Sequence, residues 1–181
     1  MFNSQEMVNY LRINKHDNFN HFQVIMGYLQ VGKPDLALSY VKEAIAQLQE
    51  NATILRLGLP NLVLWLLFKQ DELREKGIDL KILNETELKN APPWEKSLME
   101  CFTEVGNLIG KMLLEVSAEE RWWEINFTGE KTLEINFTLP ALTNGNWEEY
   151  LAEKLTDLKK INANYCCSLK EDLFTITIQI N

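Results

Sequence analysis

The sequence predicts an α+β fold, in which an antiparallel helical hairpin precedes an α/β sandwich domain. Two observations carry this prediction. Apolar residues recur with a helical period over residues 4–31 and again over residues 35–50. Further along the chain, segments with strand-like alternation are interspersed with helical segments, in an order that gives one sheet covered by helices on one face. We therefore expect a hairpin domain over residues 1–50, a linker over 51–60 and a sandwich domain over 61–181.

The hairpin is predicted from the turn between its two helices. Gly32 follows the first helix and Pro34 opens the second, which are the positions that these two residues favour at helix ends. Because the turn is short, the helices must be antiparallel neighbours. The second helix repeats apolar residues at nearly heptad spacing: Leu38, Val41, Ile45 and Leu48.

Apolar residues flank the first helix on two sides. One side carries Val8, Leu11, Phe19, Phe22, Met26 and Leu29. The other side carries Ile13, Val24 and Tyr28. A single hairpin cannot bury both sides, so we expect a homodimer in which two hairpins form a four-helix bundle.

The sandwich domain is predicted from alternating helical and strand-like segments. Its helices are expected over residues 60–77, 94–116 and 147–160. Its strands are expected over residues 78–82, 122–127, 132–137, 164–169 and 173–180. The second and third strands repeat the sequence Glu-Ile-Asn-Phe-Thr across a short gap, which predicts a β-hairpin, and residues 84–93 are expected to form a loop.

Charge and hydropathy exclude several classes of function. The net charge of -8 and the pI near 4.9 disfavour nucleic acid as a partner, because phosphate binding requires a basic face. Residues 1–20 are polar and contain no secretory signal, and the longest apolar run, residues 62–68, is far shorter than the ~20 residues of a membrane span. We therefore expect a cytoplasmic protein without membrane contact.

No metal site is expected in the chain. The three cysteines, Cys101, Cys166 and Cys167, lack the spacing of metal ligands, and we expect buried, reduced thiols. His16 and His21 lie about 140° apart around a helix, which disfavours a shared metal ion.

His16 lies in the middle of a polar stripe on the first helix. At about 100° per residue, several polar or small residues fall within roughly 40° of it: Arg12, Asn20, Gln23, Gly27 and Gln30. Its sequence neighbours Lys15 and Asp17 lie about 100° to either side. Because apolar residues flank the stripe on both sides, the imidazole is predicted to face solvent or a docking partner, and not a core.

The sequence around His16 also resembles a known family. The pattern Lys-His-Asp-x-x-Asn-x-x-Gln-x-Ile-x-Gly-x-Leu-Gln over residues 15–30 is similar to the phosphoacceptor-histidine helix of the sporulation initiation phosphotransferase B family. Sensor histidine kinases that share this type of dimerisation helix have it as well. The similarity is dense over residues 11–50 and loose beyond residue 60. It implies that His16 carries a phosphoryl group.

The resemblance suggests roles for the other residues of the polar stripe. Asn20 can donate to a phosphoryl oxygen or brace the imidazole, and Asp17 can orient the ring indirectly or contact a partner. Arg12 and Lys15 can offset negative charge around a phosphohistidine. Gln23 and Gly27 would extend the strip along which a partner helix docks. Ordinary helix-surface polarity remains an alternative for each of these supporting residues.

The sandwich domain resembles a degenerate form of the histidine-kinase ATP-binding domain. The kinase pattern Asn-Leu-Ile-Asp-Asn supplies a metal-binding asparagine, whereas this chain places Asn107 at the first position and Lys111 at the metal-binding one. An ammonium group cannot coordinate a cation. The pattern Asp-x-Gly-x-Gly, which the kinase domain needs after a strand, is also absent after residue 137. We therefore expect no ATP binding and no bound cofactor.

These expectations define a function. The resemblance implies a phosphorelay phosphotransferase that accepts a phosphoryl group from an aspartate of one response regulator on His16 and passes it to an aspartate of a second, in sporulation initiation. Mg²⁺ would belong to the regulator. Two alternatives remain open: a sensor-type histidine kinase with a divergent ATP site, and a non-catalytic dimeric adaptor that binds a response regulator.

Overall fold

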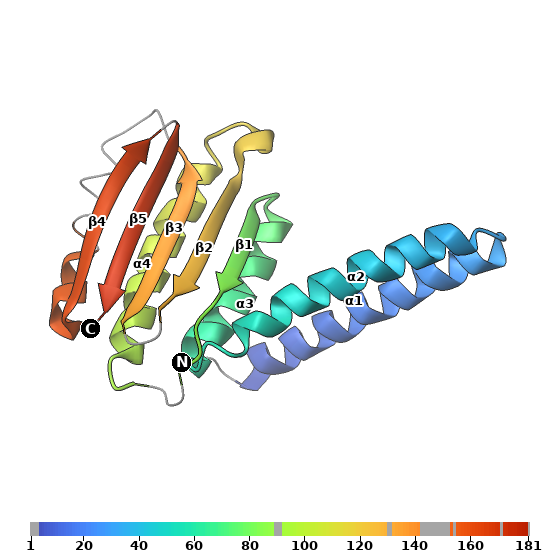
Figure 1. The fold of residues 1–181 in the computed structure, drawn as a ribbon, viewed down its shortest axis with the longest axis horizontal. Helices are drawn as coiled ribbons and strands as arrows, with labels where there is room; N and C mark the ends of the chain where they lie inside the picture. Colours follow the sequence, from blue (N-terminus) through green and yellow to red (C-terminus); the bar gives the residue numbers. More distant parts are fainter. Residues whose placement is uncertain are drawn as a thin grey trace. The chain divides into compact units, whose positions relative to one another are not determined.

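A computed structural model describes residues 4–88, 92–129, 132–141, 153, 155–170 and 172–180. The chain divides into two compact units, residues 1–52 and residues 53–181. The first unit is helical, and the second contains a five-stranded sheet, so the predicted α+β fold class is confirmed (Figure 1). None of the helices in the described part of the chain has the length and apolar composition of a membrane span.

The N-terminal unit contains the helical hairpin that the sequence predicts. Helix α1 covers Ser4–Gln30, and α2 begins at Pro34 and ends at Ile54. Gly32 adopts a φ of 69°, and the backbone N–H of Lys33 donates to the carbonyl oxygen of Tyr28 at 2.9 Å, which closes the end of α1. The turn is therefore built from the glycine and proline that predicted it.

Small and aromatic side chains join the two helices of the hairpin. Ala37 and Ala44 of α2 are buried, so the helices lie close together. The hydroxyl oxygen of Tyr40 lies 3.0 Å from Nδ1 of His21, and the rings of Tyr28 and Tyr40 lie 6.3 Å apart. The second histidine of α1 thus faces the hairpin interior.

Helix α2 is longer than predicted. It continues through the first four residues of the expected linker, because nothing between residues 51 and 54 interrupts a helix. The rest of that linker is not an exposed connection either, since Leu57 and Leu59 are fully buried in the C-terminal unit. The sequence pattern was misleading here because these leucines stand beside Gly58 and Pro60, which are typical of loops.

The C-terminal unit is one mixed sheet with helices on one face (Figure 1). The strand order is β1-β2-β3-β5-β4, in which only β1 and β2 are parallel. The strands are β1 (Asp79–Asn84), β2 (Trp122–Thr128), β3 (Leu133–Pro140), β4 (Ala163–Lys170) and β5 (Leu173–Ile180). The covering helices are α3 (Pro60–Glu75), α4 (Glu95–Leu113) and the 3₁₀ helix η2 (Thr156–Ile161), and a short 3₁₀ helix η1 (Ala118–Glu120) precedes β2.

The repeated sequence forms the centre of this sheet. Ile125 of β2 pairs with Phe137 of β3, and Phe127 pairs with Ile135, so the apolar residues of both repeats are buried on the helical face. The ring centroid of Phe102 from α4 lies 5.0 Å from that of Phe137. Alternation with a period of two therefore places one side of the repeat in the core.

Several predicted boundaries are wrong by a few residues. Strand β1 covers Asp79–Asn84 and not 78–82, because its pairing with β2 continues to Phe127. Helix α4 ends at Leu113, three residues before the predicted end. Most of the helix predicted over residues 147–160 lies outside the described residues, and its described end is the 3₁₀ helix η2.

The prediction of buried thiols is correct only for Cys101. Cys166 and Cys167 are exposed. They lie on β4, an edge strand of the sheet, and all residues from 166 to 170 are exposed, whichever face of the sheet they are on. The two cysteines of this segment are therefore not a sign that it is buried.

A buried carboxylate from α4 caps the N-terminus of α3. Oε1 of Glu95 accepts hydrogen bonds from the backbone N–H groups of Asn61 at 2.7 Å and Leu62 at 3.3 Å. Oε2 accepts a third from the side-chain amide of Asn61 at 3.1 Å. Leu59 at the N-cap position has no side-chain acceptor. Glu95, which is far from it in the sequence, therefore accepts the hydrogen bonds of backbone N–H groups that lack a partner at the start of α3.

Replacing Glu95 by Ala should destabilise the protein by about 2 kcal/mol, because two backbone donors and one amide lose their acceptor in a buried position. Urea unfolding followed by far-UV circular dichroism measures the change. Glu100→Ala is the matched control, since Glu100 is exposed on the same helix. Equal midpoints for the two variants would contradict the capping role.

Candidate functional site

His16 lies in the middle of α1, and its side chain is exposed. Asn20 follows one helical turn later, and its side-chain Nδ2 lies 3.1 Å from Nδ1 of His16. Residues four apart lie on the same face of a helix, so this contact follows directly from the sequence spacing. The predicted pair of His16 and Asn20 is therefore brought together.

The contact with Asn20 bears on the tautomer of the imidazole. An asparagine amide has nearly the same shape at its two ends and can turn either its NH₂ or its oxygen toward Nδ1. With the NH₂ group facing the ring, Nδ1 accepts and Nε2 carries the proton; with the oxygen facing the ring, Nδ1–H donates and Nε2 carries the lone pair. Asn20 can therefore hold both the orientation of the imidazole and its tautomer.

The other residues of the polar stripe lie along the exposed surface of α1. Arg12 and Gln23 are exposed. Gly27 has open space around the position that a Cβ would occupy. Such a stripe leaves room for a partner to approach the backbone closely.

The two sequence neighbours of His16 are placed differently. The ammonium group of Lys15 lies 5.9 Å from the ring centroid of Phe19, a cation–π arrangement on the apolar side of the stripe. Asp17 belongs to α1, but its side chain lies outside the described part of the structure.

Large apolar side chains cover one side of α1 and remain exposed. The exposed fraction is 64% for Leu11, 66% for Phe22 and 57% for Met26. A hollow of about 350 Å³ lies among them, lined by Leu11, Asn14, Lys15, Asn18, Phe19 and Phe22. Leu38, Ile45 and Leu48 of α2 are also about half exposed. Contiguous apolar exposure of this kind marks an interaction surface.

A second polar site lies between α3 and α4, around Asn107. The ammonium group of Lys69 donates to Oδ1 of Asn107 at 2.8 Å and to Oε2 of Glu72 at 2.9 Å. The exposed fraction of Lys69 is only 5%, whereas Asn107 and Glu72 are exposed, so a nearly buried ammonium group is paired with side chains at the surface. The side-chain oxygen of Asn107 therefore already accepts a hydrogen bond from a cation of the chain itself.

Glu72 joins two lysines at this site. Burial raises the pKa of Glu72, but hydrogen bonds from Lys76 and Lys69 lower it more, so the pKa lies below its ordinary value. Lys111 lines the same hollow, whose volume is about 190 Å³. The sequence analysis did not predict that Lys69 contacts Asn107. In the sequence, Lys69 is only a cationic residue directly after the apolar residues 62–68 of α3.

The nucleotide-binding glycine pattern that the sequence lacks would follow β3. The structure describes the chain there as far as Ala141, and residues 142–152 lie outside the described part.

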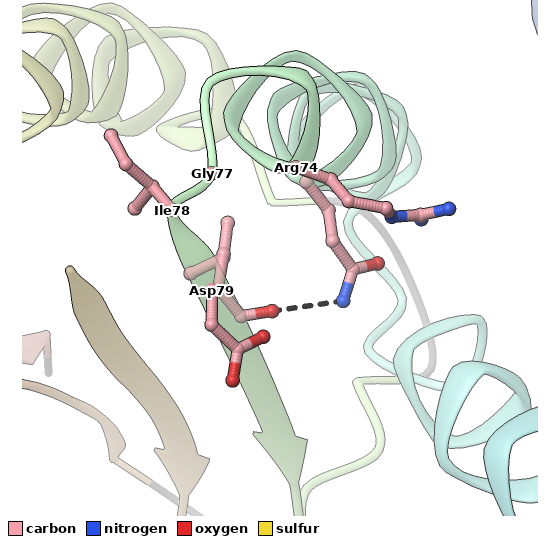
Figure 2. Close-up of a pocket in the computed structure, with 6 residues that line it drawn as sticks. Arg74, Gly77, Ile78 and Asp79 are labelled. Atoms are coloured by element: carbon pink, nitrogen blue, oxygen red, sulfur yellow. Dashed lines mark hydrogen bonds between the residues drawn. The ribbon is translucent and has the colours of Figure 1, made fainter. Parts of the chain in front are cut away.

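A third hollow, of about 240 Å³, lies between the end of α3 and the start of β1 (Figure 2). It is lined by Gln70, Arg74, Gly77, Ile78, Asp79 and Leu80. The amide of Gln70 donates to the backbone carbonyl oxygen of Leu80 at 2.9 Å, and Arg74 pairs with Asp71 at 2.7 Å. These two contacts pair Gln70 and Arg74 with other groups of the protein, so both side chains have a structural role.

Solved structures similar to the whole chain or its sandwich domain are histidine kinases and a phosphotransferase. The histidine kinase AdeS of Acinetobacter baumannii has a TM-score of 0.48 at 10% identity, over 92% of this chain and 97% of that one. The catalytic domain of the histidine kinase ThkA has a TM-score of 0.46 at 10% identity, over 68% and 91%. A bacterial phosphotransferase has a TM-score of 0.37 at 10% identity, over 98% of both chains. No curated protein sequence matches the chain.

The N-terminal helices match a family model. Residues 1–57 match the alpha-helical domain of the sensor kinase SpoOB type. The match covers the whole hairpin, including His16 and its polar stripe. Residues 1–57 are therefore similar to the alpha-helical domain of SpoOB-type sensor kinases, and the rest of the chain has no family match of its own among these findings.

Proposed function

We propose that this protein is a phosphorelay phosphotransferase, which moves a phosphoryl group between the aspartates of two response regulators through His16. The observation that carries the proposal is the exposed His16 beside Asn20, within a segment that matches the SpoOB-type helical domain. The sporulation phosphotransferases that the sequence around His16 resembles suggest the initiation of sporulation as the process.

Transfer would proceed in two displacements at phosphorus. Nε2 of neutral His16 attacks the phosphorus of the donor's aspartyl phosphate, and the bond between phosphorus and the carboxylate oxygen breaks. The carboxylate of the second regulator then attacks the phosphohistidine, and the P–N bond breaks. The protein's own contribution is to hold the imidazole, through Asn20, in line with the phosphorus. The acidic pocket of each regulator supplies Mg²⁺.

The proposed active form is a homodimer. Burial of a side chain such as Leu11, Phe22 or Met26 contributes about 1.5–3 kcal/mol, and these residues are more than half exposed in one chain. A second hairpin packed against them would complete a four-helix bundle. The polar stripe with His16 would then lie on the outside of the bundle, open to a regulator.

The arrangement around Asn107 supports a phosphoryl donor other than ATP. Lys69 already occupies the oxygen of Asn107, and Lys111 stands where the kinase pattern has a metal ligand. A cationic side chain at both positions repels Mg²⁺. We therefore expect the phosphoryl group to come from a regulator and not from a nucleotide bound by this chain.

Incubating the protein with a response regulator that carries labelled aspartyl phosphate should transfer acid-labile label to His16. His16→Gln should abolish the transfer, because the amide of glutamine lacks the nucleophilic nitrogen of the imidazole. His21→Gln is the matched control, since His21 belongs to the same helix but faces Tyr40. Autophosphorylation with labelled ATP, or retention of all label on every donor tested, would overturn the proposal.

Asn20→Ala should slow the transfer about tenfold, because the variant loses one hydrogen bond to the imidazole. The initial rate of label transfer, measured with purified donor regulator, reports the effect. Asn18→Ala is the control on the same helix, because Asn18 lies about 200° from His16 around the helix axis. A positioning role for Asn20 is contradicted if both variants transfer at the wild-type rate.

Phe22→Asp should weaken self-association at least about thirtyfold, since it places a carboxylate in the apolar contact twice per symmetric dimer. Analytical ultracentrifugation over a range of protein concentrations measures the dissociation constant. Gln23→Asp, a neighbouring substitution on the polar stripe, should leave association unchanged. A wild-type protein that sediments as a monomer at all concentrations rules out the dimer.

A further inference from the structure

The hollow between α3 and α4 has an unusual set of charges. Its lining includes Lys69 and Glu72 of α3, Lys76 directly after α3, and Lys111 of α4. The first three of these residues are three and four apart, so they lie on one side of the helix. On α4, Asn107 and Lys111 are likewise one turn apart. The two helices therefore present three ammonium groups and one carboxylate to the same small space.

The net charge of this site is opposite in sign to the net charge of the chain. The protein has a net charge of -8, yet the lining of the hollow is positive. A concentration of one sign in a recess raises the local concentration of counter-ions. One lysine would be enough to neutralise Glu72. The site contains three, because Lys69 and Lys76 both pair with Glu72 and Lys111 lines the same hollow.

Two of the three cationic groups are held by contacts within the protein. Lys69 is nearly completely buried, and its ammonium group is fixed between Glu72 and Asn107. Glu72 also holds the exposed Lys76 through its other oxygen. A Cβ at Gly110 would lie only 3.2 Å from Cδ2 of Leu73, so the missing side chain lets the helices approach closely. Lys69 and Lys76 are therefore positioned in advance, and the exposed Lys111 lies beside them on the lining of the hollow.

We propose that this hollow binds a small phosphate-type dianion. Its volume of about 190 Å³ is below the ~300 Å³ at which pockets for larger organic ligands begin, so it suits a phosphate group and not a whole nucleotide. Lys111 and Lys76 supply the charge-assisted hydrogen bonds, and Lys69 adds the buried positive charge. Binding needs no metal ion, because the lysines themselves neutralise the anion.

The phosphate group that this hollow would bind can come from two kinds of molecule. Free inorganic phosphate and the phosphate of a nucleoside monophosphate present the same terminal oxygens. If the hollow recognises the phosphate group alone, inorganic phosphate and AMP bind with similar affinity. Binding of AMP at least tenfold more tightly than phosphate identifies a nucleotide as the source, and still supports the anion site if the lysine variants below weaken it.

The test is a titration of the full-length protein with sodium phosphate, without Mg²⁺, at constant ionic strength set with chloride. Amide chemical shifts in ¹H–¹⁵N spectra should saturate for residues of α3 and α4 around the hollow. Lys111→Gln and Lys76→Gln should each weaken binding about fivefold to tenfold, since each removes one charge-assisted contact. Lys96→Gln is the control, because Lys96 is exposed elsewhere on α4 and does not line the hollow.

Two results would overturn the inference. One is a linear, unsaturated response to phosphate that chloride reproduces, and the other is an equal affinity in the wild-type protein and both hollow variants. His16→Gln should bind phosphate as the wild-type protein does, because His16 is not part of this site. Loss of phosphoryl transfer and loss of anion binding are therefore separate outcomes.

Discussion

The distribution of side chains around α1 is the constraint on which the candidate site depends. Apolar residues such as Leu11 and Phe22 occupy one side of the helix, and His21 and Tyr28 face α2 through Tyr40. The remaining sector carries His16. The contacts of His21 and Tyr28 with Tyr40 fix which side of α1 faces α2, and His16 lies on another side, where its imidazole is exposed.

In the C-terminal unit, the two buried charged residues among those that the structure describes, Lys69 and Glu95, are both matched by partners. An unpaired lysine in a protein interior is costly, and Lys69 is tolerated because a carboxylate and an amide oxygen receive its protons. Glu95 is buried in the same unit and is matched by donors at the start of α3. Both contacts tie α3 to α4, so these buried polar groups hold two helices together.

The sequence predicted best what depends on local spacing. The turn at Gly32 and Pro34, the pair of His16 and Asn20, and the repeated hairpin strands all follow from residues close in the chain. Contacts between distant residues were not predictable. Lys69 and Asn107 are 38 positions apart, and nothing in the sequence around either residue predicts their contact. The exposure of Cys166 and Cys167 was missed for the same reason, because it depends on which strand lies at the sheet edge.

The amide of Gln70 has a consequence for the protein at high concentration. Strand β1 ends the sheet on one side, and an open edge can template the addition of strands from other molecules. Gln70 occupies the carbonyl oxygen of Leu80 on that strand, so an incoming chain would have to displace a hydrogen bond before it could form its own. One glutamine side chain thus works against amyloid-like growth from this end of the sheet.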